Sequence, residues 1–247
     1  ESNNRLTNKI RAIGRVVSAI LPEIQIEGLT HKMGITRKTA HTYNKEFEGN
    51  YGQVRDVIVV EATWLGYFEP FTTRTINSFV GEMMGKSDQE TLAEEYGMQE
   101  FEIRVLEPVR TLCEKIMSLV RFSYGETPIG DLRKKIRHTY DLHQLLQQKE
   151  FIDFVESNNF DEMLLKVAKD DVVSFKNNNQ WLVHHPNDAL LFRDIDNVWR
   201  ELKTTYYSEF SNLVYGDLPS DEFILLTLKK IKERLSSIQW VIEIENR

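Results

Sequence analysis

The chain has 247 residues, of which 41% are hydrophobic and 28% charged, and its formal net charge is −7 at pH 7. This composition is ordinary for a globular protein with one large or two modest domains. The acidic balance argues against a protein that coats nucleic acid through bulk positive charge. A single cysteine, Cys113, excludes a disulfide-stabilised fold. Because disulfides do not hold this fold, we expect an intracellular, cytoplasmic protein. No apolar run reaches the roughly 18 residues of a membrane span, so we expect no such span.

The first 65 residues predict one helix and two strands. Apolar residues recur every three or four positions over 3–21, as in an amphipathic helix, and residues 23–36 are irregular or weakly extended. Residues 38–47 alternate in polarity, which is typical of an antiparallel strand with one exposed face. Residues 56–65 are apolar on both faces, which predicts a strand in the centre of a sheet.

Glu61 is the exception in that apolar strand, because it shares a face with Val57 and Val59. A carboxylate buried there is unfavourable by several kcal/mol unless it is paired, protonated or bound to a metal. The strand alone leaves two interpretations open. Glu61 either forms an ion pair with an arginine or lines a functional site.

The next segment predicts short strands over 72–76 and 101–105, with a helical turn or two after the first. Pro108 then occupies the first turn of a helix, where its missing N–H is harmless. Residues 124–130 indicate a hinge. From Asp131 onward the pattern is helical, and we expect helices over 132–148, 150–156, 160–175, 187–213 and 220–242. The chain therefore has an α+β layout, with an α/β domain over 1–125 and a helical domain over 126–247.

Two pairs of polar residues lie four positions apart on the predicted helices. Thr111 and Lys115 share one helical face, and Arg137 and Asp141 share another. Cations and a hydroxyl beside carboxylates suit a triphosphate with a divalent ion. Spacing alone, however, favours two ordinary pairs that stabilise their helices by a few tenths of a kcal/mol each.

Basic residues also gather over 133–138, and Arg110, Lys115 and Arg121 lie on the helix before them. A solvated helix face explains such a cluster, and so does a surface that faces phosphates. Charge alone favours the solvated face. A helical module that binds DNA or RNA through 133–138 stays open as an alternative.

Three motifs in order resemble the AbiEii/AbiGii family of nucleotidyltransferase-like toxins. The family pattern is a strand of the form I-x-x-E, then a P-x-x-T-x-x-x-K helix, then an R-x-x-x-D-L-x-x-L helix. Here I-V-V-E ends at Glu61, V-L-E-P-V-R-T-L-C-E-K-I covers 105–116, and R-H-T-Y-D-L-H-Q-L-L covers 137–146. The resemblance extends over about residues 3–148, with the helical tail in keeping.

The resemblance implies a DNA-polymerase-β-type mixed sheet with flanking helices, followed by an all-helical domain. It implies a Mg²⁺-dependent enzyme that transfers a nucleotide from an NTP to an acceptor such as RNA or tRNA, as the toxin partner of a cognate antitoxin. Glu61, Lys115 and Asp141 would be catalytic, with Glu61 near the metal. Thr111, Lys115 and Arg137 would bind the nucleotide.

One part of the family pattern is missing. The family has an early Gly-Ser type of turn and a D-x-D strand, and neither occurs before Glu61. We interpret this as an omitted N-terminal segment. The alternative is a degenerate nucleotidyltransferase fold that binds a nucleotide or a protein without chemistry.

Overall fold

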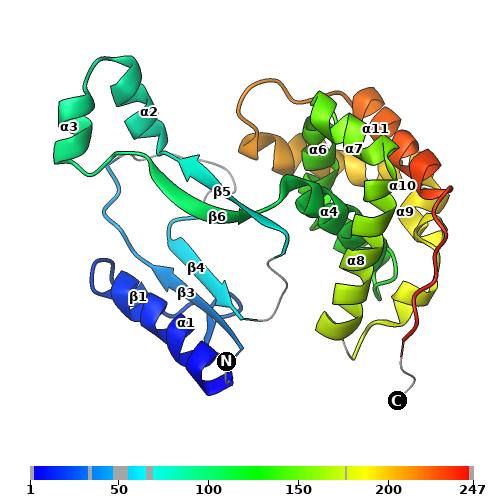
Figure 1. Ribbon diagram of the computed structural model, residues 1–247, viewed down its shortest axis with the longest axis horizontal. Coiled ribbons are helices and arrows are strands. Elements are labelled where there is room, and N and C mark those ends of the chain that lie inside the picture. The colour runs from blue at the N-terminus through cyan, green and yellow to red at the C-terminus, as the bar shows by residue number, and fades with distance from the viewer. Residues whose placement is uncertain (1–2, 33–34, 47–54, 65–68, 176, 245–247) are drawn as a thin grey trace.

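The computed structural model describes residues 3–32, 35–46, 55–64, 69–175 and 177–244. Figure 1 shows two lobes, a strand-rich lobe and a helical lobe, connected where strand β6 runs into helix α4. The α+β class that the sequence predicts is confirmed. No helix in the described ranges is both long and apolar enough to cross a membrane.

The first sheet of the strand-rich lobe is built around β3. The elements here are α1 (Asn3–Ser18), β1 (Glu23–Ile24), β2 (His31–Lys32), β3 (Thr36–His41) and β4 (Ile58–Thr63). β1, β2 and β4 all pair with β3 in antiparallel register. The central position of β3 explains why Thr39, Ala40 and His41 are at most 1% exposed.

This arrangement corrects the prediction for residues 56–65. β4 pairs with β3 alone among the described strands, so it lies at an edge and β3 takes the centre. The apolar residues of β4 are only partly buried or exposed. Apolar character on both faces therefore does not mark a central strand here. The alternating residues 38–41 do belong to a strand, but both of its faces are covered.

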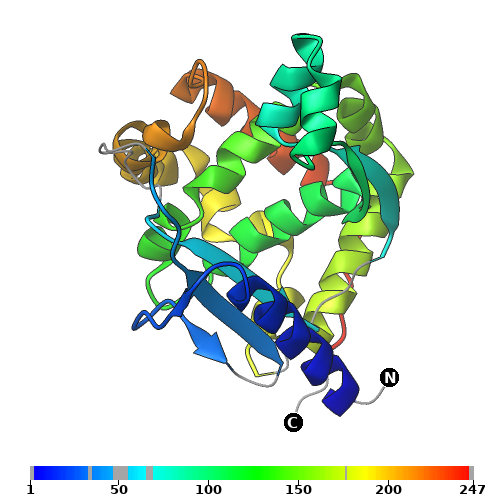
Figure 2. The same ribbon diagram turned by 90° about the vertical axis from the view of Figure 1, so that its left-hand side faces the viewer.

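Helix α1 covers the face of the sheet that points away from the helical lobe (Figures 1 and 2). The Arg37 guanidinium lies against Gly14 of α1, where a Cβ would come within 2.8 Å of Nε. Successive strand residues point to opposite faces. Lys38 and the directly opposite Glu61 therefore lie on the face that looks toward the helical lobe.

A two-stranded ribbon continues the chain as an arm. It consists of β5 (Phe71–Ile76) and β6 (Phe101–Leu106), which pair antiparallel, with α2 (Phe79–Lys86) and α3 (Glu90–Glu95) between them. α3 falls in 86–99, for which the sequence predicts no element. Most of the strand residues in the arm are exposed, so the arm holds little core of its own.

The helical lobe begins at α4, which starts at Pro108 as expected. Its α-helices are α4 (Pro108–Phe122), α5 (Pro128–Arg133), α6 (Ile136–Leu145), α7 (Lys149–Glu156), α8 (Asn158–Ser174), α9 (Leu190–Arg193), α10 (Ile195–Thr205) and α11 (Asp221–Leu235). Segments of 3₁₀ or π helix are η1 (Gln180–Val183), η2 (Pro186–Asp188), η3 (Tyr206–Phe210) and η4 (Ser211–Leu213). One continuous apolar core runs through them. The division of the chain at residue 125 stays a prediction.

Two long helices of the prediction are interrupted. The expected helix over 132–148 is split, because the Lys135 N–H bonds the Leu132 carbonyl three residues back and α6 starts afresh at Ile136. The expected helix over 187–213 becomes the series η2 to η4, and α11 ends before the predicted residue 242. Apolar spacing persists through such breaks, because a short turn of 3₁₀ or π helix shifts the buried face only slightly.

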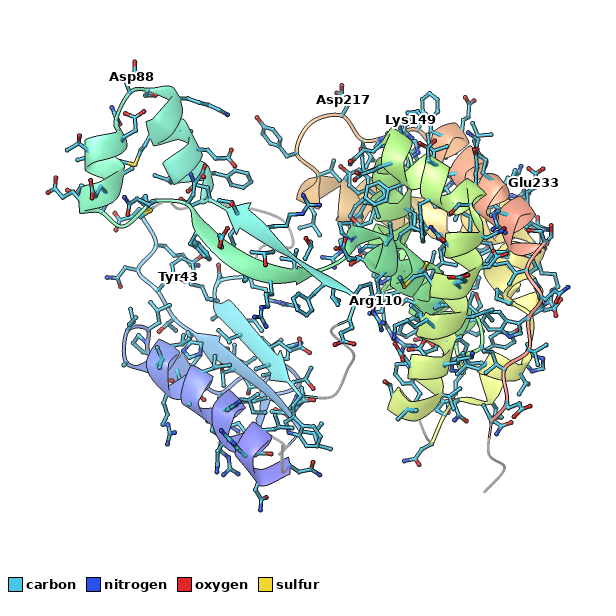
Figure 3. All side chains as sticks on the ribbon, viewed as in Figure 1. Tyr43, Asp88, Arg110, Lys149, Asp217 and Glu233 are labelled. Atoms are coloured by element: carbon cyan, nitrogen blue, oxygen red, sulfur yellow. The ribbon has the colours of Figure 1, made fainter. Side chains whose placement is uncertain are left out.

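Arg110 fixes the junction between the arm and the helical lobe (Figure 3). It lies in the first turn of α4 and is 2% exposed. Its guanidinium donates to the Glu69 carbonyl at 2.7 Å, to Asp170 Oδ2 of α8 at 2.7 Å and to Glu114 Oε1 at 2.8 Å. The expectation that Arg110 contributes to a basic surface is wrong, because its charge is buried and paired.

Candidate active site

The structure brings the two predicted helix faces together. Lys115 of α4 donates from Nζ to Asp141 Oδ2 of α6 at 2.6 Å. The side chains are 18% and 24% exposed, so the pair is largely shielded from water but remains accessible. Thr111 lies one turn before Lys115 on α4 and is half-buried. Lys115 and Asp141 thus join the two predicted faces, and Thr111 lies beside them on α4.

Asp141 is the point on which this cluster converges. Arg137 Nε lies 3.6 Å from Asp141 Oδ2, and His138 Nδ1 lies 4.0 Å from the same oxygen, which is too long for a hydrogen bond. Burial acts to raise the pKa of Asp141, but the His138 and Lys115 contacts together outweigh it, so the pKa is lowered. Asp141 is therefore a carboxylate at neutral pH.

His138 is held in its neutral form. It is half-buried, and burial is the largest influence, so its pKa is lowered although the Asp141 contact acts in the other direction. Lys115 and Lys135 lower it further through their positive charges. A neutral imidazole beside Asp141 offers a nitrogen lone pair or an N–H to a bound group.

Lys135 connects this cluster to the strand-rich lobe. Its pKa is lowered, first by burial and then by the positive charges of Arg121 and Arg137, while the carboxylate of Glu61 acts in the opposite direction. Its ammonium group also lies 4.9 Å from the centre of the Phe122 ring. Lys135 therefore sits half-buried among like charges, at the start of α6 and opposite the sheet face that carries Glu61.

Glu61 does not occupy the buried position that the sequence predicts. Its side chain is 57% exposed and forms an ion pair with Lys38 at 3.3 Å, across the β3–β4 ladder. Edge placement of β4 accounts for the exposure. The ion-pair interpretation holds, with a lysine in place of the arginine. Glu61 still faces the helical lobe, and its negative charge acts to raise the pKa of Lys135.

The described residues supply no metal centre. Nowhere in the described ranges do three or more His, Cys, Asp or Glu side chains gather closely enough to hold an ion. Glu61, the expected metal ligand, has Lys38 as its neighbour instead of a second carboxylate. These residues alone therefore do not fit a Mg²⁺ site, and binding of Mg²⁺ by Glu61 stays a prediction.

Two members of the cluster, Lys135 and His138, were not predicted as site residues from the sequence. Lys135 and His138 precede Asp141 by two steps of three residues, which places all three on one helical face. The signal was present within the basic cluster 133–138. Not every basic residue of 133–138 belongs to the site, because Lys134 is exposed and pairs with Asp131 at 3.0 Å, outside the site.

A family model described as "Nucleotidyl transferase AbiEii toxin, Type IV TA system" matches residues 1–235. No curated protein and no solved structure matches the chain. The match spans both lobes and so includes every residue of the cluster.

Proposed function

The chain belongs to the AbiEii nucleotidyl transferase toxin family, and we propose that it transfers a nucleotide from an NTP to an acceptor, with RNA as the acceptor class. An acceptor hydroxyl would attack the α-phosphorus and form a new P–O bond. The P–O bond from the α-phosphorus to the bridging oxygen would break, and pyrophosphate would leave. The hydroxyl proton passes to a base or to solvent. The cytoplasm, which holds NTPs and RNA together, is the location that this proposal requires.

The cluster around Asp141 is the observation that carries the proposal. Lys115, Lys135 and Arg137 place more positive charge there than Asp141 neutralises. Such an excess, partly buried, suits the triphosphate of an NTP, whose negative charge grows on the leaving group during transfer. The Asp141 carboxylate would hold Lys115 in position until a phosphate takes its place.

Thr111 and Glu61 are assigned roles from where they lie relative to the cluster. The Thr111 hydroxyl, one turn from Lys115, would donate a hydrogen bond to a phosphate oxygen. Glu61, on strand β4, would contribute its carboxylate from the opposite side of the site. Mg²⁺ would neutralise phosphate charge when bound, but no step is assigned to it, because the described residues do not form its site. A cognate antitoxin is the partner that the family description implies.

The proposal is tested by nucleotide transfer. Full-length protein is incubated with each labelled NTP, Mg²⁺ and total RNA, beside the variants Lys115→Ala and Lys149→Ala. Lys149 is an exposed lysine of α7 that pairs only with Asp153 in the described structure, so it controls for loss of a lysine. We expect Lys115→Ala to lower the rate about 100-fold or more, with Lys149→Ala unchanged. Equal labelling by both variants would show that Lys115 has no such role.

A binding protein without chemistry is the second candidate. The closed Lys115–Asp141 pair and the missing carboxylate cluster in the described residues favour it. It predicts that the wild-type chain binds an NTP but labels no RNA, and that Lys115→Ala weakens this binding. Transfer of label by the wild-type chain excludes it.

A further inference from the structure

A cavity lies in the helical lobe away from the Asp141 cluster. It has a volume of about 710 Å³ and lies between the end of α6, α7 and α11. Cavities that hold small organic molecules span roughly 300–1,000 Å³. The size is therefore that of a small-molecule site, and neither the predicted site residues nor the proposed function accounts for it.

Six apolar side chains contribute to the lining of this cavity, and several of them are open to water. Phe223 and Leu226 of α11 are 58% and 52% exposed, and Ile152 of α7 is 39% exposed. Leu146 and Ile231 extend the same lining toward the core. Covering such surface is favourable by about 25 cal/mol per Å², so the cavity favours an apolar occupant.

One buried polar group in the lining has a free acceptor. His143 is 9% exposed, and its Nδ1 lies 2.9 Å from Thr227 Oγ1. The Thr227 hydroxyl donates its one hydrogen to the Phe223 carbonyl at 3.0 Å. The Gln147 amide nitrogen also lies 3.4 Å from Nδ1, which is longer than an ordinary hydrogen bond, so the 2.9 Å contact with Thr227 sets the tautomer. Nδ1 of His143 is then the donor to Thr227, which leaves Nε2 with a lone pair in the neutral ring. Among the described residues Nε2 has no hydrogen-bond partner.

The charges at the rim do not select an anion. Lys230 is accompanied by Glu156 and Glu233. The Arg234 guanidinium is already bonded to the Val155 and Ser157 carbonyls, to Asp161 and to Ser237. Burial also lowers the pKa of His143, so the ring is neutral at pH 7. The site thus offers apolar surface and a neutral acceptor, unlike the cationic cluster around Asp141.

We propose that this cavity binds a small neutral molecule with an apolar body and one hydrogen-bond donor, which bonds Nε2 of His143. The inference is independent of nucleotide transfer, since it concerns other side chains and other ligand chemistry. Indole and 1-methylindole are matched probes, because they share an apolar ring system and only indole has an N–H.

Binding of the two probes to the full chain is followed by calorimetry and by the ¹⁵N resonances of the histidine rings. Indole is expected to bind saturably, to shift the His143 Nε2 signal, and to bind five- to tenfold more tightly than 1-methylindole. His143→Phe should abolish the difference between the probes. Leu226→Trp, at the exposed mouth, should block both probes, whereas Val173→Trp on the surface of α8 should not.

The proposal is overturned if neither probe binds saturably, or if Leu226→Trp binds them as the wild-type chain does. It is also overturned if the wild-type chain sediments as a dimer and Leu226→Trp as a monomer, since the cavity would then belong to an interface between copies. A cooperative thermal unfolding transition would show that Leu226→Trp is folded. The result holds whether or not the chain transfers nucleotides, because no NTP or RNA is present.

Discussion

Arg110 and Lys166 offer a matched test of a buried ion pair at the scale of single residues. Both contact Asp170 Oδ2. Arg110 does so at 2.7 Å with its side chain buried, and Lys166 at 3.6 Å with its side chain 44% exposed. Removal of Arg110 leaves a buried carboxylate without its main partner. We expect Arg110→Met to lower the free energy of unfolding by about 3–5 kcal/mol, and Lys166→Met by less than about 1 kcal/mol. Equilibrium unfolding in urea measures both, and equal losses would contradict the buried role of Arg110.

Asp171 is a residue whose protonation should govern stability below neutral pH. Burial raises its pKa to about 6 from 3.8, although Arg121 acts to lower it. The folded state thus holds the proton more tightly than the unfolded state. The resulting stabilisation is present below about pH 4 and is lost as the pH rises through about 6.

The variant Asp171→Asn removes this titration. We expect it to be more stable than the wild-type chain at pH 7.5, where the wild-type carboxylate is charged and buried, and to match it at pH 3.8. The upper bound of the difference is about 3 kcal/mol, from 1.36 kcal/mol per pKa unit. Urea unfolding of both chains between pH 3.8 and 7.5 provides the comparison. Curves that stay parallel over this range would show that Asp171 titrates normally.

Residue pairings are the part of the site that the sequence could not specify. Helical spacing predicted that Thr111 and Lys115 share a face, and likewise Arg137 and Asp141. It could not indicate that Lys115 meets Asp141, 26 positions away. Nor could it distinguish a buried Arg110 from an exposed one, because the covering carboxylate, Asp170, lies 60 positions further on.

At the scale of elements, α2 contains two glycines in contrasting surroundings. A Cβ on Gly81 would lie 2.2 Å from Asn77 Oδ1 and 2.4 Å from the Met98 backbone carbonyl, whereas one on Gly85 would meet nothing within 4 Å. Gly81 therefore allows α2 to approach the chain that leads into β6. Gly85 has no such task, and alanine is the better helix former by about 1 kcal/mol.

We expect Gly81→Ala to destabilise the arm of β5, β6, α2 and α3, and Gly85→Ala to leave it unchanged or slightly stabilise it. Backbone amide exchange of residues 71–106 reports on this arm by itself. Faster exchange there in Gly81→Ala, with slower or equal exchange in Gly85→Ala, is the predicted pattern. If both variants protect the arm equally, the close approach at Gly81 does not constrain it.

Helices and strands were predicted correctly where a single hydrophobic periodicity runs through a segment. They were predicted incorrectly where tertiary contacts determine the structure. α4 follows its apolar period from Pro108, and β5 and β6 form where short strands were predicted. The 56–65 segment is apolar on both faces and yet forms an edge strand. A strand's place in a sheet depends on which strands come to lie beside it, and its own residues do not encode that. Glu61 was misjudged for this reason.

At the scale of the molecule, charged groups of the two lobes face each other at the candidate site. The strand-rich lobe presents Lys38 and Glu61, and the helical lobe presents Lys135 and the Asp141 cluster. Within the described contacts, the arm is tied to the helical lobe by Arg110, which bonds the Glu69 carbonyl. The relative placement of the two halves of the site should therefore depend on α4, which carries both Arg110 and Lys115.

Cys113 gives a direct measure of how the helical lobe opens. It is the single cysteine of the chain, it is 0% exposed in the core beside Leu112 and Ile116, and burial raises the pKa of its thiol well above the ordinary value. A thiol reagent can therefore reach a reactive thiolate only when the lobe opens. Labelling in native buffer should be slower than in urea by the opening equilibrium constant.

Two variants then separate opening of the arm from opening of the lobe. Arg110→Met removes a buried charge from α4 and should accelerate labelling of Cys113 about 100-fold or more, the factor that a loss of about 3 kcal/mol implies. Gly81→Ala weakens only the arm, and we expect its labelling rate to equal that of the wild-type chain. Acceleration by Gly81→Ala as well would mean that arm and lobe unfold as one cooperative unit, because a contact confined to α2 could not otherwise reach Cys113.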